Sequence, residues 1–245
     1  MKKITSIILS LAMLLGLAAC GTEPVPTQPA PGTTAPEPSI SQEEEPAPST
    51  SSESDEESDP NDTLVVYFSL PETDDPNDMT EEEENSTVII DGEVLGNTQY
   101  MAYVIQEQTG ADIFRIEAEN PYPLDHDTLV DQAAEEQDQQ ARPAIADQVE
   151  NMADYDVVYL GYPNWWADMP MILYTFLEEY DLSGKTIIPF NTHGGSGFSR
   201  TIDTIRELEP EAAVLDGLTI SRNSIQDAEQ EIVDWVQGIQ DQIGE

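Results

Sequence analysis

The feature that most constrains this chain is a regular alternation, after residue 62, of short apolar runs with segments of helical periodicity. The run Leu64–Phe68 is apolar, β-branched and aromatic throughout, which is typical of a strand covered on both faces. Residues 97–109 then have apolar side chains at helical spacing and stop at Gly110, a residue that ends helices readily. Because strands that alternate with helices are joined by crossovers, the pattern predicts a parallel sheet.

The alternation continues along the chain. It predicts four further strands, at residues 111–116, 155–161, 185–190 and 213–218. It also predicts helices at residues 127–140, 171–179, 198–208 and 224–239. The last helix would open at Ser224 and Asp227, which have the spacing of a capping box. We therefore expect an α/β fold, a doubly wound five-stranded parallel sheet with helices on both faces.

A long insertion separates the first predicted strand from the first predicted helix. It carries eight acidic residues between Leu70 and Asn85. Thr87–Ile90 then has the character of a strand and leads into the turn Asp91-Gly92. We expect a mobile acidic loop followed by a short hairpin.

The first twenty residues have the pattern of an export signal. Lys2 and Lys3 precede an uncharged apolar run, from Ile4 to about Leu15, that is too short for a transmembrane helix. The following Leu-Ala-Ala-Cys, ending at Cys20, resembles the lipobox of bacterial lipoproteins, in which cleavage leaves a lipid-bearing cysteine. We expect a signal peptide at 1–19 and lipid on Cys20, which anchors the protein outside the cytoplasm at the bacterial cell membrane. The alternative is a plain secretory peptide.

The next segment, 20–62, has the composition of a disordered linker. Between Gly21 and Asp62 it contains nine of the eighteen prolines, eleven acidic residues and no aromatic side chain. Such a segment cannot bury enough apolar surface to offset the entropy of ordering. As a free coil it would hold the folded domain, 63–245, roughly 35–40 Å from the anchor.

The charge of the chain restricts its partners. Fifty Asp and Glu stand against eight Lys and Arg, a formal net charge of −42. Nucleic-acid binding depends on Lys and Arg that displace counterions, so we expect no nucleic-acid partner. A protein partner would be basic, because the negative field steers positive surfaces toward it.

Unusual residues follow the first, third and fourth predicted strands, at the sheet edge where α/β proteins bind ligands. Ser69 follows the first strand, and Gly96-Asn97-Thr98-Gln99 opens the helix after the insertion. This helix start offers backbone N–H, hydroxyl and amide donors that suit a phosphate, although such residues also serve as ordinary caps. Because no Lys or Arg lies between Lys3 and Arg115, neutral dipoles would bind the phosphate.

The other two loops carry aromatic residues and glycines. At most one of Trp165 and Trp166 should pack inward while the other flanks the cleft, since consecutive side chains in an extended loop diverge. The alternative is that both cover helix ends. Residues 192–197 are glycine-rich and allow close approach of a ligand, unless they form an ordinary turn. We give His193 no catalytic role.

Together these motifs resemble the flavodoxins, in particular a flavodoxin-like family of bacterial FMN proteins. The resemblance covers 63–240 and rests on segments Val65–Ser69, Gly96–Thr98, Ala141–Ala144, Tyr155–Trp166, Asp168–Pro170, Gly184–Phe190 and Thr192–Gly197. It implies the strand order 2-1-3-4-5 and one non-covalent FMN. The insertion would then lie beside the phosphate and could shield the flavin or dock a partner.

The resemblance also implies roles for individual residues. The phosphate would be held by Ser69, Asn97, Thr98 and Gln99. One side of the isoalloxazine would be bordered by Pro163, Asn164, Trp165 and Trp166. The other loop would be lined by Thr192, His193, Gly194, Gly195 and Ser196. No catalytic residue and no metal ligand is assigned.

Three functions remain open at this point. The first is a membrane-anchored extracytoplasmic FMN protein acting in electron transfer with redox partner proteins. The second is an FMN-dependent reductase of quinones or other small-molecule electron acceptors, which needs a cleft open above the flavin. The third is a flavin-free acidic binding module, against which Thr98, Trp165 and Trp166 argue.

Overall fold

A computed structural model describes residues 62–244. The predicted signal peptide, Cys20 and the linker up to residue 61 lie outside the described residues. Within 62–244, no helix combines the length and the apolar character needed to cross a membrane.

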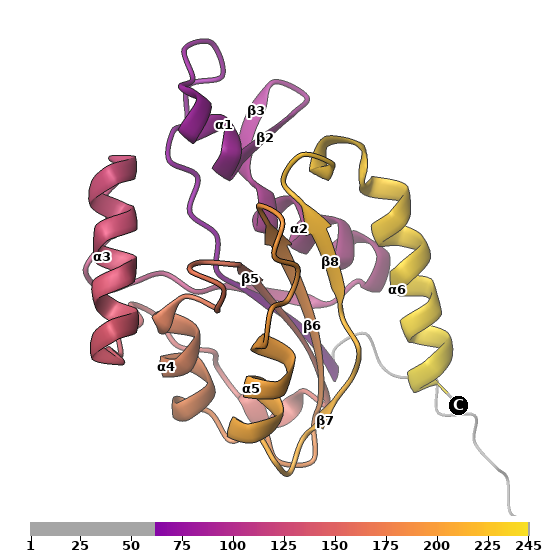
Figure 1. The fold of residues 1–245 in the computed structure, drawn as a ribbon. Helices are drawn as coiled ribbons and strands as arrows, with labels where there is room; N and C mark the ends of the chain where they lie inside the picture. The colour runs from indigo at the N-terminus through magenta and orange to yellow at the C-terminus, as the bar shows by residue number, and fades with distance from the viewer. Residues whose placement is uncertain (1–61, 245) are drawn as a thin grey trace, which may run out of the picture. The chain divides into compact units, whose positions relative to one another are not determined.

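The central sheet is parallel, in the order β4-β1-β5-β6-β7, and β8 also pairs with β6 (Figure 1). Its strands are β1 (Thr63–Tyr67), β4 (Asp112–Arg115), β5 (Val157–Pro163), β6 (Thr186–His193), β7 (Ala213–Val214) and β8 (Leu218–Ser221). The predicted α/β fold with a parallel sheet is confirmed.

Helices cover both faces of this sheet (Figure 1). One face is packed by α2 (Asn97–Thr109) and α6 (Glu229–Ile243), and the other by α3 (His126–Gln139), α4 (Met171–Glu179) and α5 (Thr201–Leu208). In β1, Val65 and Tyr67 face the first core, whereas Leu64 and Val66 face the second. This two-sided burial explains why the strand is apolar without alternation.

The single strand expected at 213–218 is instead two short strands. β7 pairs with the start of β6 and β8 with its end. Pro189, in the middle of β6, has no N–H to donate to a ladder. Gly217 approaches this residue so closely that a Cβ would lie 1.9 Å from the Pro189 carbonyl oxygen. The edge strand is therefore interrupted at this point.

The capping box expected at Ser224 is wrong. The Ser224 side chain caps no backbone N–H, and a single 3-10 turn, η3 (Ile225–Asp227), follows it. The final helix α6 begins only at Glu229. Ile225 and Ala228 are both buried, so packing against the core fixes this turn ahead of the helix.

The insertion after β1 is more regular than expected. The hairpin is confirmed as β2 (Thr87–Ile90) and β3 (Glu93–Gly96), which pair antiparallel. Part of the acidic segment, however, is a short helix, α1 (Glu81–Ser86), rather than a loop. Thr80 and Glu83 form a reciprocal capping box at its start, which accounts for the helix. In Figure 1, α1, β2 and β3 lie together beyond one end of the sheet.

Candidate functional site

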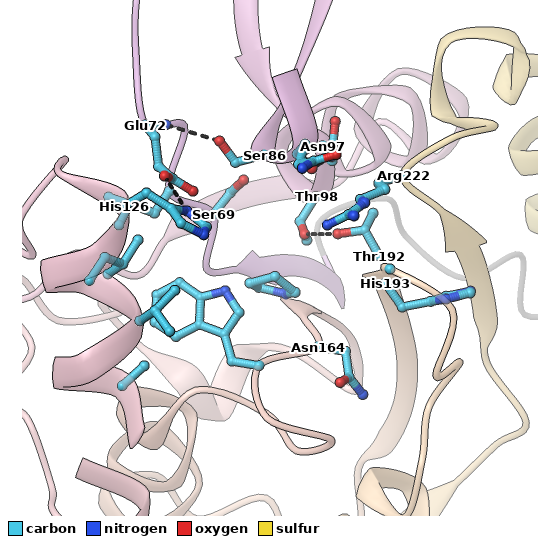
Figure 2. A pocket seen from close by; sticks show the side chains of 18 of the residues that line it. Ser69, Glu72, Ser86, Asn97, Thr98, His126, Asn164, Thr192, His193 and Arg222 are labelled. Carbon is cyan, nitrogen blue, oxygen red and sulfur yellow. Dashed lines mark hydrogen bonds and ion pairs between the residues drawn. The ribbon is translucent and has the colours of Figure 1, made fainter. Parts of the chain in front are cut away.

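A pocket of about 240 Å³ lies where β1, β5 and β6 end (Figure 2). It combines all three predicted loops. Among the residues predicted for the site, those that line it are Ser69, Asn97, Thr98, Pro163, Asn164, Trp165, Trp166, Thr192, His193 and Gly194. The carboxyl edge of the sheet therefore brings together segments that lie more than 120 residues apart in the sequence.

Three predicted residues do not line the pocket and instead support its walls. Gln99 accepts a hydrogen bond from the Gly96 N–H at 3.1 Å, so its side chain caps its own helix. The Gly195 N–H donates to Nδ1 of His193 at 2.8 Å. Ser196 Oγ donates to Oδ1 of Asn164 at 3.0 Å, which joins the two loops after β5 and β6.

One wall is formed by the start of α2 against the end of β1. A Cβ on Gly96 would lie 2.2 Å from Ser69 Oγ and 3.2 Å from Ser69 Cβ, so a larger residue here would displace the Ser69 side chain. The side chain of Asn97 donates to the Asn85 carbonyl at 2.9 Å and so ties α2 to the insertion. Its Oδ1 is buried and has no partner among the described residues.

A hydroxyl pair connects this wall to the loop after β6. The Oγ1 atoms of Thr98 and Thr192 lie 2.8 Å apart, and both side chains are buried. Figure 2 shows the two side chains joined by a dashed line, with Arg222 beside them. One hydroxyl donates to the other, which leaves a single hydroxyl proton free to donate to a ligand.

The two tryptophans divide as predicted. Trp165 packs edge-on against Phe68 and Tyr122, with ring centroids 5.4 and 5.7 Å apart. Trp166 is 56% exposed, has a φ of 53°, and donates from its indole nitrogen to the Val130 carbonyl in α3. Trp165 therefore lines the pocket while packing, partly buried, against the core, and Trp166 stands at the rim.

The loops after β5 and β6 are fastened to each other by Asn164. Its Nδ2 donates to the Gly197 carbonyl and to Ser199 Oγ, each at 3.1 Å. Nδ1 of His193 already accepts the hydrogen bond from Gly195, and burial lowers the pKa of this imidazole. His193 is therefore neutral near pH 7 and supports the conformation of its own loop.

Sequence reasoning missed one pair of residues in the pocket, Glu72 and His126. Oε2 of Glu72 lies 2.8 Å from Nδ1 of His126, and the Glu72 side chain is only 6% exposed. The pair joins the insertion to the start of α3. Nothing in the acidic run distinguished Glu72 from its neighbours, since the pairing depends on where α3 lies.

Arg222 was also missed, although it follows β8 and so could have been found by the rule that identified the other loops. It brings a positive charge to a pocket for which we expected neutral dipoles alone. The remaining residues that line the pocket but were not predicted are Leu70, Asn85, Ser86, Leu129, Val130 and Ala133.

Comparison with known proteins agrees with this fold. The family model for flavodoxin matches residues 90–239. Two crystal structures assigned as flavoproteins are similar. The one from Bacteroides eggerthii has 28% identity and a TM-score of 0.51, covering 69% of this chain and 96% of its own. The one from Bacteroides uniformis has 25% identity and a TM-score of 0.52, covering 69% and 98%. No curated protein matches.

Proposed function

This chain belongs to the flavodoxin family, and on that premise we propose that it binds one FMN non-covalently in the pocket and acts in electron transfer. The observation that carries the proposal is the pairing of two features in one pocket. Hydroxyl and amide groups at the start of α2 lie at one end, and the exposed indole of Trp166 lies at the rim. A flavin phosphate needs the first feature and a flat ring system suits the second.

The donor set fits the phosphate group. Ser69 and Thr98 offer hydroxyl groups, and the first turn of α2 offers backbone N–H groups that no intrahelical acceptor uses. Because Gly96 carries no Cβ, the Ser69 side chain packs directly against it, which places the Ser69 hydroxyl beside the start of α2. We propose that these groups hold the phosphate and that Trp165, fixed by Phe68 and Tyr122, keeps the wall behind the ring rigid.

Bound FMN would supply the ability to accept and donate one or two electrons. The chain's own contribution is electrostatic and steric. Its net charge of −42 disfavours additional negative charge in the pocket, so we expect a low reduction potential. Salt screens these charges and should make the lowering smaller. The loops after β5 and β6, joined by Asn164, hold the ring side of the pocket in place.

We also propose that the protein works outside the cytoplasm, anchored through lipid on Cys20 by the linker 20–62. The support is in the sequence: a basic start, an uncharged apolar run, the Leu-Ala-Ala-Cys motif and a proline-rich acidic segment. The excess of acidic residues favours a basic redox partner protein. Labelling of cells with a lipid precursor, compared between the parent and Cys20→Ser, would test the anchor.

A second candidate, a reductase of quinones or other small acceptors, is favoured by the exposure of Trp166. An indole that is 56% exposed at the rim leaves room for a planar acceptor to approach the ring side of the pocket. The two functions differ in turnover. A carrier should show no steady oxidation of a nicotinamide cofactor in the presence of quinone, whereas a reductase should.

The first experiment is a titration of the purified protein with FMN, followed by flavin fluorescence and absorbance. The titration should include refolded protein with excess FMN, so that failed loading is not read as failed binding. We expect saturable quenching at micromolar FMN or below. A colourless protein that quenches no fluorescence at micromolar FMN would overturn the redox proposals and leave an acidic binding module.

A further inference from the structure

Arg222 is a positively charged side chain at the pocket, positioned by the end of β8 and by the loop after β6. Arg222 directly follows β8, and its backbone N–H donates to the His193 carbonyl oxygen at 2.9 Å. Its guanidinium lies against Gly194, where an added Cβ would be 3.3 Å from Nη1 and 3.4 Å from Cζ. The strand end and the missing Cβ together let this side chain lie along the loop and reach the pocket.

The charge of Arg222 is not used within the described residues. In 62–244 its guanidinium has no carboxylate within 4.0 Å and no side-chain hydrogen bond, whereas Arg115, Arg142 and Arg206 each pair with an acidic residue. This is notable in a chain with fifty acidic and only eight basic residues. Such a planar group binds phosphate oxygens through two parallel N–H bonds.

The neighbours of Arg222 are those expected around a phosphate. Figure 2 shows its guanidinium directed toward Thr98 and Thr192, on the side of the pocket where α2 begins. Among the described residues that line the pocket, Arg222 is the only Lys or Arg. Glu72, the only carboxylate in that set, is directed toward His126 at 2.8 Å and so leaves the arginine unpaired.

We propose that Arg222 recognises the phosphate of the flavin and makes the pocket selective for FMN over riboflavin. This inference rests on the proposed FMN site and deepens it. The neutral donors of Ser69 and Thr98 would orient the phosphate, while Arg222 would supply the only permanent counter-charge. The chain thus provides from its last strand the cation that is missing from the sequence between Lys3 and Arg115.

The test compares the dissociation constants of FMN and riboflavin, measured by flavin fluorescence, for the parent, Arg222→Gln and Arg200→Gln. Arg200 is a matched control, because it is an exposed arginine before α5 that has no ion pair within 62–244 and does not line the pocket. We expect Arg222→Gln to weaken FMN binding about tenfold or more and to leave riboflavin binding unchanged. FMN affinity should also fall with rising KCl, and less steeply in Arg222→Gln.

The other outcomes are distinct. If Arg222→Gln weakens both flavins equally, the residue acts on the ring or on the loop, and the inference is overturned. Unchanged FMN binding, or an equal loss in Arg200→Gln, would overturn it as well. If the parent binds neither flavin, the proposed function itself fails. If it binds both and Arg222→Gln changes nothing, only this inference fails.

Discussion

The hydroxyl oxygens of Thr98 and Thr192 lie 2.8 Å apart, although 94 residues separate them in the sequence. The contact joins the first turn of α2 to the end of β6 and is buried on both sides. The position of one wall of the pocket is therefore coupled to the position of the other. A change on one wall is therefore expected to alter ligand binding at the other.

Replacing Thr98 by Val removes this hydroxyl and conserves the shape of the side chain. We expect FMN affinity to fall about tenfold, because the hydroxyl at the start of α2 is lost from the phosphate end of the pocket. The free energy of unfolding should fall by about 1–2 kcal/mol, because the buried Thr192 hydroxyl loses its partner. FMN titration and urea unfolding measure the two effects. Thr204→Val, on α5 and outside the pocket, is the control and should leave FMN affinity unchanged.

Substitutions of the two tryptophans should differ in their effects on stability and on FMN binding. Trp165→Ala removes a ring packed on Phe68 and Tyr122, and should lower the free energy of unfolding by about 2–4 kcal/mol. Trp166→Ala should cost less than about 1 kcal/mol, since the side chain is mostly exposed, yet weaken FMN binding. Equal losses of stability in the two variants, measured in urea, would contradict this division.

The Glu72–His126 pair should hold the insertion against α3. His126→Ala leaves a buried carboxylate without its partner, so we expect residues 70–86 to detach more often. Limited digestion with a glutamate-specific protease should then cleave the acidic segment several times faster. Asp127→Ala, a change of the exposed residue next along α3, should digest at the parent rate. Identical rates in all three proteins would exclude this role.

Glu209 should make stability depend on pH. Burial, together with the nearby charge of Asp181, raises the pKa of the Glu209 carboxyl to about 7 from an ordinary value of 4.5. Between these values the folded protein binds more protons than the unfolded chain, so this group's contribution to stability decreases as pH rises from about 4.5 to 7. Glu209→Gln should lose less stability than the parent between pH 5 and 8.

The measurement for Glu209 is the urea midpoint at several pH values. Repulsion among the many other carboxylates also weakens the protein as pH rises, so the comparison between variants carries the result. Glu207→Gln removes an exposed charge two residues before Glu209, in α5, and should follow the parent profile apart from a small offset. If Glu209→Gln and the parent have parallel profiles, Glu209 does not titrate in this range.

Local pattern predicted some elements closely and failed at others for identifiable reasons. Helices α2 and α4 have the predicted bounds, because their apolar spacing and end residues are local signals. The prediction of one edge strand at 213–218 is wrong because Pro189, on the neighbouring strand β6, interrupts the pairing at Gly217. The predicted start of α6 at Ser224 is wrong because burial of Ile225 overrides the capping preference of Ser224.

The residues of the site also divide into those whose place local pattern predicts and those whose place it does not. The motif predicts Gln99 at the phosphate, whereas in the structure its Oε1 accepts from the Gly96 N–H at the start of its own helix. The resemblance predicts that Ser196 lines the flavin side of its loop, whereas in the structure its hydroxyl donates to Asn164 Oδ1. Which way a polar side chain turns depends on the partners within reach, and these come from other loops.

The sequence by itself determined the class of fold and the three loops of the pocket, since periodicity and strand ends are properties of neighbouring residues. Only the tertiary structure decided that Thr98 meets Thr192, that Glu72 turns to His126, and that Arg222 reaches the pocket from the last strand. These contacts join residues far apart in the chain. They are fixed by how helices and strands pack on the sheet, a relationship that no local pattern contains.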